Sequence, residues 1–277
     1  MIAIVSTFKE SYKDVRAHLP QWIKIAFAPF VMWFIALASM GIALYLSGGF
    51  DFTTTQEGVL QNEPEASLAG DFFTVVHYVL ETLAAMVLYI NAFRYAALGE
   101  GGDKWWAFPL NGRLVKMFLY YLLIVVLIFV YSGGAAGVTF GSYLLIENIF
   151  LTGLLGGLFA VGLIYLATRL TLTFLYVAVD QTEPLRTSWH LMKGNVLRVL
   201  GLFLLIGLVI LGITILGSVI IGFGGWLLSL INMWLGLIIF ALFVPFGLSV
   251  WLVSIALMTK AIALVNKQLR EPLLING

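Results

Sequence analysis

One acidic residue, Glu81, lies deep inside a long apolar stretch of the sequence. His77 and Thr74 precede it by one and two helical turns, so a helix would place the three side chains in one stripe. A carboxyl group and an imidazole at this spacing can share a proton or bind a cation, and an ionisable residue within a membrane span is a functional candidate. The alternative is a neutral Glu81 that is hydrogen-bonded to His77 or to a neighbouring span. Two ligands are too few for a metal site, so we expect none.

A second set of candidates consists of cations, with one tryptophan, near the ends of apolar stretches. Arginine can donate two parallel hydrogen bonds to a phosphate, and tryptophan favours the depth of lipid headgroups. We therefore interpret these residues as contacts to lipid headgroups or to the membrane interface. Within the set, we expect Arg169 at the inner headgroups, with Asp180 and Glu183 as candidate ion-pair partners. The set is Arg94, Arg113, Arg169, Arg186, Trp189, Lys193 and Arg198.

The composition requires lipid as the solvent around these residues. The chain is 61% hydrophobic and 10% charged, whereas soluble domains carry about 25% charged residues. All 15 Lys and Arg residues fall in four clusters, and pairs of apolar stretches separate these clusters. Cytoplasmic loops are enriched in Lys and Arg, so the pattern predicts six crossings with both termini in the cytoplasm. The clusters cover residues 9–24, 94–116, 169–198 and 260–270.

The sequence therefore predicts an all-α, polytopic membrane protein with a single transmembrane domain, residues 1–277. Two amphipathic helices are expected at the inner interface, at residues 4–19 and 184–193. In the first of them, an apolar face contains Val5, Phe8, Tyr12, Val15 and Leu19. The predicted spans are residues 21–46, 71–98, 113–138, 149–176, 196–221 and 230–258.

Glycine and proline give further expectations about the spans. Gly133, Gly137 and Gly141 recur every fourth residue, which favours close packing of the third span against the fourth. Gly222–Gly225 is expected to form the short outer turn between the last two spans, and the sequence leaves open whether this turn re-enters the bilayer. Pro245 and Gly247 predict a bend within the last span.

Two groups of short motifs resemble an uncharacterised bacterial family of six-helix membrane proteins. This family is related to the membrane domain that is fused to some glycerophosphodiester phosphodiesterases. The resemblance implies a membrane domain that is not itself catalytic, and it carries over no site residues. We find no phosphodiesterase domain in this chain. The motifs are Asn91-Ala-Phe-Arg94, Leu98-Gly99-Glu100, Trp105, Gly112-Arg113, Arg169-Leu-Thr-Leu, Asp180, Ser188-Trp189, Lys193-Gly194-Asn195 and Arg198-Val-Leu-Gly201.

Several classes of function are excluded or disfavoured. Cysteine is absent, which excludes disulfides and thiolate chemistry, and no nucleotide-binding loop, zinc-protease helix or nucleophile elbow occurs. We expect no enzymatic activity, no cofactor and no nucleic-acid partner, and the sequence does not indicate an oligomeric state. The leading hypothesis is a protein of the bacterial inner membrane that binds anionic lipids or partner membrane proteins at its basic cytoplasmic face. The alternatives are a transporter of a small solute or lipid, with a cavity near Glu81, and an intramembrane enzyme.

Overall fold

The computed structural model describes residues 2–46, 68–108 and 111–275, so much of the predicted first outer connection lies outside it. Within these residues the chain is helical and contains no strand. Six helical stretches are long and apolar enough to cross a bilayer. The prediction of an all-α, polytopic membrane protein with six spans is therefore confirmed. The stretches are Leu19–Leu46, Leu68–Leu98, Gly112–Leu145, Ile149–Ala178, Val196–Ile231 and Met233–Arg270.

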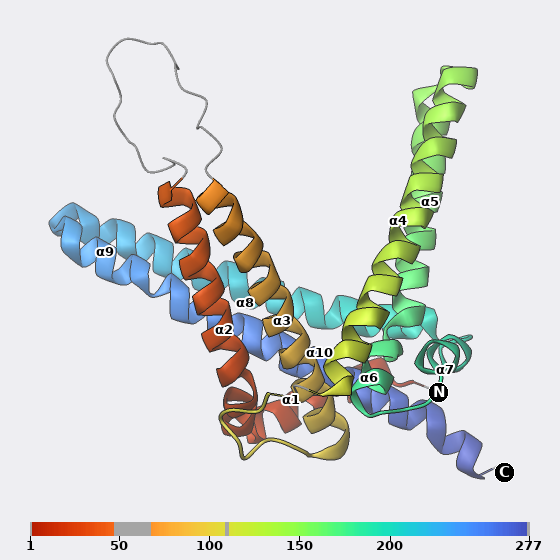
Figure 1. Ribbon diagram of the computed structural model, residues 1–277, viewed down its shortest axis with the longest axis horizontal. Helices are drawn as coiled ribbons and strands as arrows, with labels where there is room; N and C mark the ends of the chain where they lie inside the picture. The colour runs from red at the N-terminus through yellow and green to blue at the C-terminus, as the bar shows by residue number, and fades with distance from the viewer. Residues whose placement is uncertain (1, 47–67, 109–110, 276–277) are drawn as a thin grey trace.

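The spans form three helical hairpins that diverge from a common base (Figure 1). Each hairpin is a pair of spans that are consecutive in the sequence, and the two members of each pair contact each other. The first pairs α2 (Leu19–Leu46) with α3 (Leu68–Leu98), the second pairs α4 (Gly112–Ile146) with α5 (Ile149–Leu170), and the third pairs α8 (Val196–Ile231) with α9 (Met233–Ala241) and α10 (Phe243–Ile275). The hairpin of α4 and α5 is the least covered, since none of the most apolar stretch of Ile149–Ala178 is buried within the protein.

The base holds much of the buried hydrophobic core. It contains α1 (Ile4–Ala17), α6 (Leu172–Ala178), α7 (Pro184–Leu191), residues 99–108 and the adjoining ends of the spans. Both described termini lie at this end (Figure 1). We call it the basic end because the four Lys and Arg clusters of the sequence lie at the ends of spans that meet here. The two predicted amphipathic helices correspond to α1 and α7. Large side chains that are almost fully buried fill this region, among them Trp22, Leu175, Tyr176, Met192 and Leu257.

Helix α1 packs against the protein through a face that contains two hydroxyl groups. Thr7 and Ser11 are fully buried and Val15 is nearly so. The Gln268 amide of α10 donates a hydrogen bond of 3.0 Å to the Thr7 hydroxyl, and Lys260 of α10 forms an ion pair of 3.1 Å with Asp14. The apolar face that the sequence predicts is therefore only partly the packing face. Val5 and Tyr12, which belong to it, are exposed on the protein surface.

Helix α8 ends ten residues beyond the predicted end of the fifth span, so the turn between the last two spans lies further along the chain than predicted. Helix α8 continues to Ile231, so Gly222–Gly225 is helical, and the prediction of a turn there was wrong. The turn is at Asn232, whose side chain accepts a hydrogen bond of 2.8 Å from the Trp234 backbone N–H. An asparagine at this position caps the following helix, whereas a glycine within an apolar span has no alternative partner for its backbone and remains helical.

The last span is interrupted close to the predicted bend. Helix α9 ends at Ala241, and α10 begins at Phe243. Pro245 has no N–H to donate to the Ala241 carbonyl, and its ring crowds that carbonyl, so the break falls one turn before the proline.

The glycines that permit close helix packing are not the predicted ones. A Cβ atom added at Gly133, Gly137 or Gly141 would meet no atom within 4 Å, so the prediction of close packing through these three glycines was wrong. At Gly236 an added Cβ would lie 3.0 Å from the Gly225 carbonyl oxygen, so the turn between α8 and α9 requires glycine there. Residue spacing identifies small residues but not the face of the helix that meets a neighbour.

Candidate functional site

The structure brings His77 and Glu81 together within α3. The His77 imidazole is buried, and its Nδ1 lies 2.8 Å from the Ala36 carbonyl oxygen of α2. Its Nε2 lies 3.6 Å from Glu81 Oε2. Thr74 uses its hydroxyl within its own helix, where it donates to the Gly70 carbonyl at 2.9 Å. The predicted stripe therefore contains one interacting pair, and that pair connects α3 to α2.

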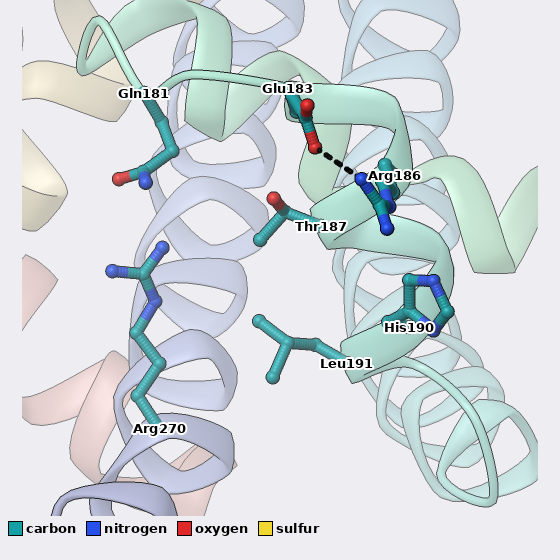
Figure 2. A pocket seen from close by; sticks show the side chains of 7 residues that line it. All are labelled: Gln181, Glu183, Arg186, Thr187, His190, Leu191 and Arg270. Carbon is teal, nitrogen blue, oxygen red and sulfur yellow. Dashed lines mark hydrogen bonds and ion pairs between the residues drawn. The ribbon is translucent and has the colours of Figure 1, made fainter.

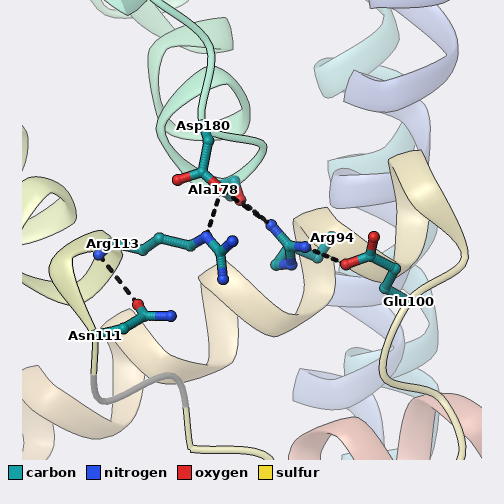
Figure 3. Close-up of polar contacts among 6 residues, drawn as sticks. All are labelled: Arg94, Glu100, Asn111, Arg113, Ala178 and Asp180. Carbon is teal, nitrogen blue, oxygen red and sulfur yellow. Dashed lines mark hydrogen bonds and ion pairs between the residues drawn. The ribbon is translucent and has the colours of Figure 1, made fainter.

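Arg94 and Arg113 meet at a common acid, Asp180 (Figure 3). Arg113 Nε donates to Asp180 Oδ2 at 2.5 Å, and Arg94 Nη1 lies 3.6 Å from the same oxygen. Arg94 also donates to the Ala178 carbonyl at 3.0 Å and pairs with Glu100. This cluster joins the end of α3, the start of α4 and the connection from α6 to α7. The guanidinium groups of both arginines are thus engaged within the protein.

The local backbone explains why Asp180 can reach both arginines. Asp180 has a φ of 57°, a left-handed conformation that aspartate adopts more readily than most residues. This conformation turns the chain directly after α6. A resemblance motif contains Asp180, but periodicity gave no reason to place it beside Arg94 and Arg113.

Arg169 has a different environment from Arg94 and Arg113. Its guanidinium carbon lies 3.7 Å from the centroid of the Trp189 ring, which places the cation over the indole. Its Nε donates to the Trp189 carbonyl at 3.1 Å, and its Nη1 donates to the Tyr165 hydroxyl at 3.2 Å. Among the described side chains Arg169 forms no ion pair, so the predicted partnership with Asp180 or Glu183 was wrong. We call Arg169, Trp189 and Tyr165 the Arg169 site.

Neighbouring contacts hold the Arg169 site in place. The buried Ser188 hydroxyl donates to the Arg169 backbone carbonyl at 2.8 Å, which fixes α7 against the end of α5. A guanidinium has five N–H donors, and two of those of Arg169 donate to described residues. No other described residue accepts from the remaining donors, which together with the positive charge could bind an anion. The sequence identified Arg169 and Trp189 separately, and the fold brings them into contact.

A groove of about 490 Å³ lies between α7 and the end of α10. Figure 2 shows Arg270 extending from α10 toward Gln181, with Thr187 and Leu191 projecting from α7. Arg186 and His190 line the same groove, but Arg186 pairs with Glu183 at 3.2 Å. The groove therefore has a net positive charge, although one of its arginines is already compensated. Sequence spacing could not identify Arg270, because it is about eighty residues from α7.

The remaining predicted contacts, Lys193 and Arg198, lie outside these clusters. Lys193 is exposed just after α7, and Arg198 Nη1 lies 3.5 Å from the Asn195 side-chain oxygen. Both residues belong to the basic end and add to its positive charge.

Comparisons of this chain with protein-family models, with curated proteins and with solved structures each found no match. The resemblance to a six-helix bacterial family therefore stays a prediction.

Proposed function

We propose that this chain is a non-enzymatic, multi-pass protein of the bacterial inner membrane that binds the phosphate groups of anionic lipids at its basic end. The basic end would face the cytoplasm, because Lys and Arg residues are concentrated in cytoplasmic segments. All four basic clusters of the sequence lie at the ends of spans that meet in this part of the fold. Anionic lipids attract such a surface by about 1 kcal/mol per Lys or Arg.

The Arg169 site is the observation that supports this proposal most directly. Arg94, Arg113 and Arg186 each pair with a carboxylate, whereas Arg169 is stacked on Trp189 and forms no ion pair among the described residues. Because its hydrogen bonds to the protein already orient the guanidinium, less side-chain entropy is lost when a phosphate binds. Trp189 is 39% exposed, as expected for an indole at headgroup depth.

Native mass spectrometry of the purified protein with phosphatidylglycerol and phosphatidylcholine tests the proposal. A hydrogen bond to a charged group contributes about 1.5–3 kcal/mol, so we expect Arg169→Gln to weaken phosphatidylglycerol binding by about 10–100-fold. The matched control is Arg16→Gln, which removes the same charge from an exposed position on α1.

If the two variants lost phosphatidylglycerol binding equally, only the net charge would matter. That result would contradict the role of the Arg169 site in binding the lipid. A wild-type protein that binds the two lipids equally would contradict the proposed function itself. If a copurifying membrane protein, but no anionic lipid, depended on Arg169, the basic end would instead bind a protein partner.

A further inference from the structure

The middle of the hairpin of α2 and α3 contains a polar pair that is separate from the proposed lipid site, His77 and Glu81. His77 lies within an apolar span, yet both nitrogens of its ring face oxygen atoms. A carbonyl oxygen can only accept a hydrogen bond, so the Nδ1 atom, 2.8 Å from the Ala36 carbonyl oxygen, must carry a proton.

The second nitrogen then determines the protonation of the pair. In a neutral imidazole with a proton on Nδ1, Nε2 has a lone pair and no proton. That lone pair would face Glu81 Oε2 at 3.6 Å. An ionised carboxylate in this position would bring two acceptors together and would place a net negative charge inside the span, which is costly.

We infer that His77 and Glu81 form an intramembrane site that binds one proton, which lies either on Nε2 or on the Glu81 carboxyl group. Both forms are electrically neutral. In the first an imidazolium faces a carboxylate, and in the second the unprotonated Nε2 of a neutral imidazole faces a carboxylic acid, at the 3.6 Å separation of the two groups. Exchange between the forms moves the proton from one atom to the other and changes neither the total charge nor the hydrogen bond to α2.

Among the described residues few titratable groups lie near this proton, and the buried Ser39 hydroxyl donates to the same Ala36 carbonyl oxygen at 2.7 Å. The Tyr78 ring packs against His77 with centroids 5.2 Å apart. On α2, Lys24 and Tyr45 are twelve and nine residues from Ala36, roughly 18 and 14 Å along the helix. The basic residues of α10, which also contacts α3, are Lys260, Lys267 and Arg270 at the basic end.

Only one member of the pair is exposed on the protein surface. The His77 side chain is 11% exposed, whereas that of Glu81 is 47% exposed. A change in the protonation of Glu81 therefore leaves the hydrogen bond from His77 to α2 intact.

Two measurements at pH 8 test the inference, because an ordinary imidazole is then neutral and an ordinary glutamate is ionised. The first is native isoelectric focusing in detergent of the wild type, Glu81→Gln and Asp71→Asn. Asp71 is the matched control, since it is an exposed acid in the first turn of the same helix. We expect Asp71→Asn to raise the isoelectric point by the amount that the loss of one negative charge produces, and Glu81→Gln to leave the isoelectric point unchanged.

The second measurement is nitrogen NMR of histidine-labelled wild-type protein, which needs no variant to fold. We expect the His77 signal to show a protonated Nδ1, either in the neutral form with Nε2 bare or in the imidazolium form. A neutral His77 with its proton on Nε2 would overturn the inference. So would a Glu81→Gln shift as large as that of Asp71→Asn.

Discussion

Asp180 holds three parts of the basic end together, so its charge makes a measurable contribution to stability. The change Asp180→Asn removes that charge but keeps a side chain that tolerates the left-handed backbone at this position. Arg113 then loses a charge-assisted hydrogen bond of 2.5 Å, and Arg94 loses an ion-pair partner at 3.6 Å.

The expected loss follows from the burial of the three side chains. A hydrogen bond between charged groups contributes about 1.5–3 kcal/mol. Asp180 is 39% exposed and Arg113 is 32% exposed, so water weakens this bond, and the lower part of the range applies. Arg94 is only 17% exposed but keeps Glu100 and the Ala178 carbonyl, so its share is below about 1 kcal/mol. We expect Asp180→Asn to lower the free energy of unfolding by about 2 kcal/mol.

Reversible unfolding in mixed micelles with increasing dodecyl sulfate measures this change. The matched control is Glu183→Gln, which lies three residues away, also has a positive φ and also removes an acid paired with an arginine. Its pair with Arg186 is 64–72% exposed, so we expect a loss below about 1 kcal/mol. If Asp180→Asn lost no more stability than Glu183→Gln, Asp180 would not be the link between α3, α4 and the connection from α6 to α7.

Three further substitutions, one of them a control, test the packing of the helices. At Gly236 an added Cβ would lie 3.0 Å from the Gly225 carbonyl oxygen, so we expect Gly236→Ala to lower the free energy of unfolding by about 1–3 kcal/mol. The control is Gly212→Ala in α8, where the added methyl group meets open space, so we expect the free energy of unfolding to stay the same or to rise slightly. Equal losses of stability in the two variants would contradict the close contact at Gly236. Thr7→Val keeps the shape of a buried residue but leaves the Gln268 amide without its acceptor, which should cost about 1–3 kcal/mol. An unchanged free energy of unfolding would show that this hydrogen bond does not hold α1 to α10.

The sequence predicts the six long apolar helices because their evidence is local. An apolar helix in lipid must satisfy its own backbone, so length and hydrophobicity suffice to find it. The end of α8 was missed because Gly222–Gly225 has the composition of a turn but lies where no water competes for its backbone. The cap at Asn232 was a local signal that could have placed the turn correctly.

The candidate sites were predictable only in part. His77 and Glu81 are one turn apart on one helix, so their contact follows from periodicity. Arg169 and Trp189 are twenty residues apart on different helices, and their stacking depends on how α7 returns against α5. The contribution of α2 to the His77 site, through the Ala36 carbonyl, could not be predicted, because a backbone carbonyl has no signature in the sequence.

The orientation of the basic end is the claim on which the proposed function depends, and cysteine labelling tests it directly. The sequence has no cysteine, so each variant would carry a single thiol. Lys193→Cys places that thiol at an exposed position of the basic end, and Asp71→Cys places it at an exposed position in the first turn of α3, away from the basic end. With a membrane-impermeant maleimide, we expect intact cells to label Asp71→Cys, and Lys193→Cys to react only after the cells are opened. Labelling of Lys193→Cys in intact cells would contradict the account.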